Sequence, residues 1–364
     1  MTMCPTEEPT VIEEQSFNEV RGVVQLGVGL CRDSFFPTRF AVSVIRRMRK
    51  RLFRLVKAGV TLGSMRLDIV CFLFSTYSQS LVLHALSFCD ADSAQVTLLD
   101  RAQEDFAREL LGAPTNMDGF LATAELGLSD YRTLCAQTKV LMFHRVYSNP
   151  EDDLSRRMFH WPRVADGSTT LDLTSALLVT LGIDMPAADY FATPYPQAKG
   201  IVKRHARSLQ QETWRAKCEA SPVNSNFTLH TKQKWGRDPE VIALPPKQAK
   251  MFLQARMGAL CSPLNCRGRC KYCDGTPSPA HLIWLCPKTL GSRLGFFEET
   301  CARHPSIHRS ILALDPHSAL LFVLGQGVES ARASDWSAFF RMAAAFVCEV
   351  RTLSVWPVHM SSPE

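Results

Sequence analysis

The chain has 364 residues, 46% of them hydrophobic, and a formal net charge of +6. This length allows two or three domains, and the mean hydropathy of -0.04 is typical of a soluble globular protein. The mild basic bias permits a polyanionic partner without requiring one. An odd total of thirteen cysteines argues against a closed disulfide framework.

Residues 1–20 are acidic and polar, and we expect them to be disordered. They lack the basic segment and apolar run of a secretory signal peptide. We therefore expect a protein that is not secreted but intracellular, nuclear or cytoplasmic, and kept in a reducing compartment. In that setting clustered cysteines indicate a metal site more often than disulfides.

The next region, residues 21–160, is predicted to be helical. A short β-like run over Val23 to Leu30 precedes a long helix, in which the apolar face is formed by Ile45, Met48, Leu52 and Val56. Residues 94–111 form a helix that ends at Gly112. A further helix ends at Gly127, and Ser129 and Asp130 are both placed to cap the one that follows.

One segment, Ile69 to Cys89, contains no charged residue and is long enough to span a bilayer. Several polar side chains lie near its middle, where they would be costly in lipid. We therefore predict a buried helix here and no membrane partner.

The remaining chain divides into three regions. Residues 161–245 are a basic helical and linker region, 246–295 a zinc-binding segment, and 296–364 a C-terminal helical region. Asp315 starts one helix of the last region. The apolar side of the final helix is predicted to consist of Trp336, Phe339, Phe340, Ala343, Val347 and Val350. The fold class is thus mostly α: a helical bundle, an irregular linker, a small metal knuckle and C-terminal helices.

The strongest motif is Cys270-x2-Cys273-x7-His281-x4-Cys286. A Cys-x2-Cys turn directs two thiolates to one tetrahedral ion, and the chain must return with two more ligands. His281 and Cys286 are five residues apart, which a distorted helical turn can accommodate. Four protein ligands without a carboxylate predict a structural Zn²⁺ site, for which nearby Cys261 or Cys266 could replace one ligand.

A cationic cluster in the first long helix is the second candidate site. Its cations, with no acid among them, are Arg46, Arg47, Arg49, Lys50, Arg51, Arg54 and Lys57. A phosphate backbone would offset their mutual repulsion, although pairing with acids such as Glu104, Asp105 and Glu109 is an alternative. Beside the first zinc ligands, Arg267, Arg269 and Lys271 predict contacts to single-stranded RNA, and Tyr272 offers either a stacking face or packing against the knuckle.

The segment KMFLQARMGALCSPLNCRGRCKYCDGTPSPAHLIWLCP resembles the C-terminal zinc-binding segment of non-LTR retrotransposon reverse transcriptases. Arg256-Met257-Gly258 matches the family's Arg-x-Gly element, and Pro287 and Arg293 match residues after its last ligand. Upstream, the helices from Ala41 onward and LLGAPTNMDGFLATAELGLSDYR resemble the polymerase thumb and the segment after it. The resemblance covers residues 21–350 and is weakest over 160–240.

The resemblance implies a nucleic-acid-binding segment that is not itself an enzyme. A reverse transcriptase needs a palm with paired aspartates for two metal ions. Asp152-Asp153 lies in a polar segment instead, and fingers and palm would precede residue 21. We therefore expect RNA or DNA as a partner, with a separate palm-bearing polymerase chain supplying the chemistry. The alternative is a helical protein-interaction module in which zinc only stabilises the fold.

Overall fold

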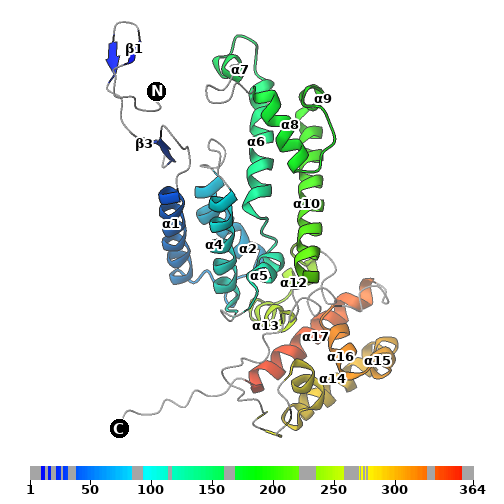
Figure 1. Ribbon diagram of the computed structural model, residues 1–364. Helices are drawn as coiled ribbons and strands as arrows, with labels where there is room; N and C mark the ends of the chain where they lie inside the picture. Colours follow the sequence, from blue (N-terminus) through cyan, green and yellow to red (C-terminus); the bar gives the residue numbers. More distant parts are fainter. Residues whose placement is uncertain are drawn as a thin grey trace, which may run out of the picture. The chain divides into compact units, whose positions relative to one another are not determined.

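The structure is a computed structural model, and the chain is mostly α-helical, as predicted (Figure 1). The structure describes residues 10–12, 15–17, 22–25, 28–31, 38–83, 93–113, 117–159, 169–220, 235–257, 270, 272–273, 275, 278–325 and 333–354. Among the helices of these residues, none combines the length and the apolar character needed to cross a membrane.

Two small antiparallel hairpins precede the helices. β1 (Thr10–Ile12) pairs with β2 (Gln15–Phe17), and β3 (Gly22–Gln25) pairs with β4 (Val28–Cys31). The second hairpin accounts for the β-like run predicted over Val23 to Leu30. The first lies in the segment expected to be disordered, where the β-branched pair Val11 and Ile12 favours extended backbone.

The helices form two compact units. The first comprises Met1–Leu55, Phe72–Gln103 and Ser129–Thr213, and the second comprises Val56–Cys71, Glu104–Leu128 and Trp214–Glu364. Four of the five boundaries fall within helices, at Leu55, Cys71, Gln103 and Thr213, and the fifth, at Leu128, falls between two helices. In chain order the helices up to Ala220 are α1 (Thr38–Lys57), α2 (Leu67–Phe74), the π-helix η1 (Ser75–Gln79), α4 (Ser93–Leu111), α5 (Gly119–Leu126), α6 (Tyr131–Tyr147), α7 (Leu154–Phe159), α8 (Thr170–Thr180), α9 (Ala187–Ala192) and α10 (Tyr195–Ala220).

The core of the first unit joins α6 to α8, α9 and α10 (Figure 1). Val140, Leu178, Tyr190 and Val202 are among its buried side chains. The boundary predicted at residue 160 falls within this core. Within the predicted helical and linker region, residues 170–180, 187–192 and 195–220 are helical; a reciprocal capping box of Thr169 and Asp172 starts α8. The part of the predicted linker over 221–234 lies outside the described residues.

Helix α1 buries a narrower face than predicted. Val44, Met48 and Leu52 are buried, whereas Ile45 and Val56 are only half-buried. The predicted buried helix at Ile69 is amphipathic instead: residues four apart, from Val70 through Phe74 to Ser78 and Val82, are buried, but Phe72 is 65% exposed. Residues 84–89 of that segment lie outside the described residues.

The second unit contains the helices that position the cysteine cluster. They are α5, α12 (Pro239–Ile242), α13 (Pro246–Arg256), the π-helix η2 (His281–Leu285), the 3-10 helix η3 (Pro287–Thr289), α14 (Leu290–Arg303), α15 (Pro305–Leu312), α16 (Pro316–Val323) and α17 (Ala333–Ser354). Every residue predicted for the apolar side of the final helix is buried. Phe340 of α17 packs edge-on against Phe252 of α13.

The predicted helix ends are confirmed where local chemistry sets them. Gly127 ends α5 in the left-handed region, with φ 64°, where glycine is favoured. Asp130 accepts a hydrogen bond from the Thr133 N–H at 2.8 Å at the start of α6. Asp315 caps α16 in the same way, through the His317 and Ser318 N–H groups.

Candidate metal centre and basic helix

The four predicted ligands lie together in the second unit. One donor atom from each of Cys270, Cys273, His281 and Cys286 lies within 4.8 Å of all the others. The Sγ atoms of Cys270 and Cys286 are 3.8 Å apart, and Cys273 Sγ is 3.2 Å from His281 Nε2. A disulfide would bring two sulfurs to about 2.0 Å, so this is a converging set of free donors suited to a metal ion.

A π-turn sets the spacing of the last two ligands. In η2 the Cys286 N–H donates to the His281 carbonyl at 2.7 Å, a five-residue hydrogen bond. The distorted turn expected from the spacing is therefore present, with one ligand at each end. The Thr289 hydroxyl donates to the carbonyls of Leu282 and Cys286 at 2.7 and 3.0 Å, which ties η3 to the irregular turn.

Aromatic packing anchors this turn to its helices. Trp284 of η2 is buried and stacks on Phe297 of α14, with ring centroids 5.7 Å apart. It also contacts Phe296 of α14 and Phe346 of α17. The half of the site that carries His281 and Cys286 is therefore built on packed helices.

Burial and neighbouring sulfurs control the cysteine protonation states. Burial, reinforced by the nearby Cys270 and Cys273 sulfurs, raises the pKa of the Cys286 thiol to about 11. Burial acts in the same direction on Cys270, but hydrogen bonds from the Tyr272 N–H and the neighbouring thiols outweigh it and lower the pKa of Cys270. A divalent cation at this position would favour the thiolate form of both cysteines.

Gly275 closes the knuckle where a side chain cannot fit. Its carbonyl accepts the Cys270 N–H at 2.7 Å. A Cβ at this position would lie 2.5 Å from His281 Cε1 and 2.9 Å from Nδ1.

Substituting Gly275→Ala is therefore expected to displace the imidazole and to weaken metal binding by about 10- to 100-fold, as loss of ligand-orienting contacts does. Titration with cobalt(II), whose visible absorption reports tetrahedral coordination, measures this. The control is Gly291→Ala in α14, where nothing lies within 4 Å of the added Cβ. Equal cobalt(II) affinities for the two variants would contradict the close contact between Gly275 and the His281 ring.

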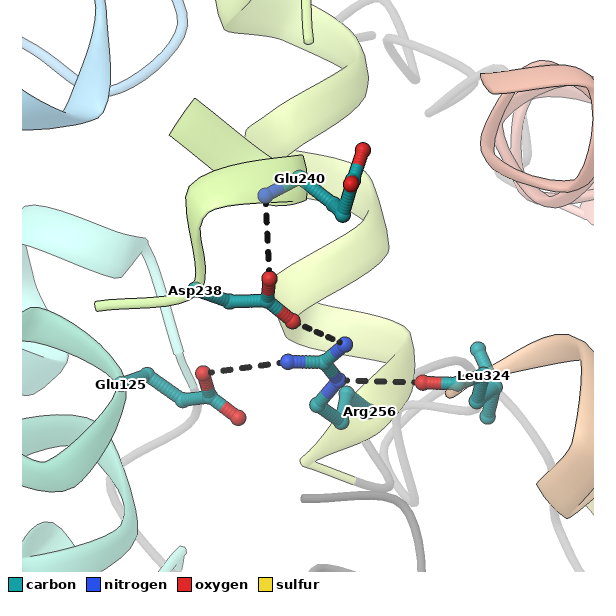
Figure 2. Close-up of polar contacts among 5 residues, drawn as sticks. All are labelled: Glu125, Asp238, Glu240, Arg256 and Leu324. Carbon is teal, nitrogen blue, oxygen red and sulfur yellow. Dashed lines mark hydrogen bonds and ion pairs between the residues drawn. The ribbon is translucent and has the colours of Figure 1, made fainter. Parts of the chain in front are cut away.

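A buried ionic cluster surrounds Arg256 at the end of α13 (Figure 2). The Arg256 side chain is 1% exposed; its Nη2 donates to Asp238 Oδ2 at 3.0 Å and its Nε to the Leu324 carbonyl at 3.1 Å. Nη1 lies 3.6 Å from Oε2 of the fully buried Glu125. Asp238 caps α12 through the Glu240 N–H, and Leu324 caps the end of α16. One guanidinium thus joins the start of α12 and the ends of α13 and α16 to the last turn of α5.

Sequence reasoning missed this cluster, although a signal was present. Glu125 and Arg256 are single charges within apolar runs, FLATAEL and MFLQARM. Such charges are buried only when paired. They belong to the Glu-Leu-Gly and Arg-x-Gly elements on which the family resemblance depends.

The seven cations predicted on α1 divide by exposure. The exposed ones are Arg46, Arg49, Lys50, Arg54 and Lys57, whereas Arg47 and Arg51 are half-buried. Arg51 Nη1 donates to the Tyr77 carbonyl at 2.7 Å, so this guanidinium holds neighbouring backbone. Asp105, one of the acids weighed as an alternative partner, pairs with Arg108 on its own helix.

The other predicted contact residues are only partly described. Arg267, Arg269 and Lys271, with Cys261 and Cys266, lie outside the described residues. Tyr272 is 41% exposed, and Lys288 Nζ lies 5.5 Å from its ring centroid, a cation–π distance. Asp153, in the polar segment weighed against a palm, accepts the Ser155 N–H at 2.8 Å at the start of α7.

Comparison with known proteins adds no relative. No protein-family model, no curated protein and no solved structure matches this chain.

Proposed function

We propose that this chain is a nucleic-acid-binding module stabilised by a structural zinc ion, akin to the C-terminal segment of a non-LTR retrotransposon reverse transcriptase. The observation that carries the nucleic-acid proposal is the charge of α1. Five exposed cations share one helix of twenty residues that contains no acidic residue. Like charges three and four residues apart on a helix repel one another, and a phosphate backbone supplies the opposite charge.

The distances in the cysteine cluster support zinc. Zinc binds thiolates at about 2.3 Å, so two sulfurs at the tetrahedral angle lie about 3.8 Å apart, and a sulfur and an imidazole nitrogen about 3.6 Å apart. The Cys270 and Cys286 sulfurs match this separation at 3.8 Å, and Cys273 and His281, at 3.2 Å, need to move apart only slightly. Three cysteines and a histidine fill all four positions, which suits a structural ion.

The likeness to the reverse transcriptase segment is supported by the pairing of its two elements. Glu125 and Arg256, far apart in sequence, form one buried ionic contact. We propose that the chain binds RNA or DNA and that a palm-bearing polymerase chain carries out the chemistry.

The test is binding of zinc-loaded protein to a fluorescent single-stranded RNA across a salt series, repeated after chelation. The logarithm of the affinity is expected to fall with the logarithm of salt concentration at about -0.7 for each phosphate contacted. Tight, salt-sensitive binding that disappears when zinc is removed by chelation supports the module. Weak, salt-insensitive binding contradicts it.

Charge removal on α1 gives a sharper expectation. The double variant Lys50→Gln, Arg54→Gln should lower the magnitude of the salt slope by about 1.4, because two phosphate contacts are lost. Arg51→Gln should change the slope less, since Arg51 is bound to the Tyr77 carbonyl. The matched control is Arg303→Gln, Arg309→Gln, which removes two exposed cations from α14 and α15. If the control lowers the salt slope as much as the α1 double variant does, RNA binding depends on net charge alone and not on α1.

A zinc-stabilised protein-interaction module is the second candidate, favoured by one observation. Leu285 of η2 and Leu290 and Leu294 of α14 are 57%, 44% and 51% exposed. Exposed apolar side chains next to a metal site suit a protein partner. This function predicts RNA binding that is weak and insensitive to salt. It also predicts that the double variant Leu290→Ser, Leu294→Ser no longer binds the protein partner.

A further inference from the structure

An exposed aromatic ring lies within the cationic face of α1. Phe53 is 63% exposed, although the helix has its own buried apolar face of Val44, Met48 and Leu52. Leaving most of a ring of this size in water forgoes up to about 2 kcal/mol that burial would contribute.

Helical spacing surrounds this ring with positive charge. Arg49 and Lys50 precede Phe53 by four and three residues, and Lys57 follows it by four. Side chains three and four residues apart are neighbours on a helix surface. Phe53 is therefore flanked by cations one turn before and one turn after, all of them exposed.

We infer that Phe53 is a stacking platform for an unpaired base, and that the flanking cations hold the phosphates on either side of that base. This inference rests on the proposed function and specifies its ligand as single-stranded nucleic acid. A ring among cations matches a polymer that alternates flat apolar faces with anionic groups. In a duplex the base faces already stack on one another, so only the phosphates would reach α1 and Phe53 would gain little.

The test compares Phe53→Ala with wild type in the full-length, zinc-loaded protein. Stacking of one base predicts a loss of about 5- to 150-fold in affinity for a mixed-sequence single-stranded RNA. The salt slope should stay unchanged, because no phosphate contact is lost. Phe53→Tyr should retain wild-type affinity, whereas Phe53→Leu, apolar but without a π face, should resemble Phe53→Ala.

The matched control is Phe72→Ala. Phe72 is exposed to the same degree, at 65%, but its helix α2, LDIVCFLF, carries no cation. This variant should bind single-stranded RNA as wild type does. Circular dichroism confirms folding of each variant, and an RNA duplex of equal length should bind wild type and Phe53→Ala alike.

The outcomes separate this inference from the proposed function. If wild type binds RNA with a steep salt slope but Phe53→Ala binds equally well, the stacking platform is wrong and the module stands. If wild type does not bind RNA at all, both are wrong. Binding of wild type to phosphatidylserine vesicles in preference to RNA, with loss in Phe53→Ala, would overturn the inference in favour of membrane insertion.

Discussion

Replacing Cys286 with serine is expected to abolish tight zinc binding and to loosen the Cys-x2-Cys half of the site. Cys286 is fully buried and supplies one of four donors, and among the described residues 270–286 the buried apolar side chains Leu282, Ile283 and Trp284 all belong to η2. Structural zinc in small peptides supplies about 10–16 kcal/mol of apparent folding free energy, so loss of a ligand removes what holds Cys270 and Cys273 against η2. Elemental analysis of the purified protein should give one zinc per chain for wild type and none for the variant.

The control for this experiment is Cys301→Ser. Cys301 is an exposed thiol on α14, close in sequence but outside the cluster. This variant should retain one zinc per chain. Retention of zinc by the Cys286 variant, with normal affinity, would contradict the ligand set.

Replacing Arg256 with methionine is expected to lower the free energy of unfolding by about 3–5 kcal/mol. The substitution removes the ion pair to the buried Glu125 carboxylate and the hydrogen bonds to Asp238 and the Leu324 carbonyl, and breaking a buried ion pair by removing one partner costs about that much. Urea denaturation of the zinc-loaded protein, followed by circular dichroism, measures the change.

Two comparisons make this measurement specific. Adding Glu125→Gln to Arg256→Met should recover part of the loss, because the orphaned charge is removed. Arg303→Met, which breaks the exposed ion pair with Glu299, should change stability little. A loss below about 1 kcal/mol in Arg256→Met would show that the cluster is solvated in the folded protein.

The sequence predicted those features that local chemistry determines. Gly127, Asp130 and Asp315 mark helix ends because a left-handed glycine or a capping carboxylate acts within one turn. The ligand set was predictable for the same reason, since a Cys-x2-Cys turn and a five-residue return restrict the geometry whatever the surrounding fold. The buried side of α17 followed from its helical spacing.

Features that depend on distant partners were not predictable. Nothing local indicates that Glu125 meets Arg256, or that Arg51 holds the Tyr77 carbonyl rather than a phosphate. The region around α8 to α10 was predicted to contain helices but not to share a core with α6, so the predicted boundary lay at residue 160. Its helices are stabilised by burial against α6, which only the tertiary structure reveals.

The Arg256 cluster also constrains how the protein is made. Glu125 leaves the ribosome about 130 residues before Arg256 and about 200 residues before Leu324, whose carbonyl completes the cluster. At about 5–20 residues per second, Arg256 follows Glu125 after roughly 7–26 s and Leu324 follows it after roughly 10–40 s. The cluster therefore closes late in translation, and a nascent chain that stops before the end of α16 lacks the carbonyl that accepts from Arg256 Nε.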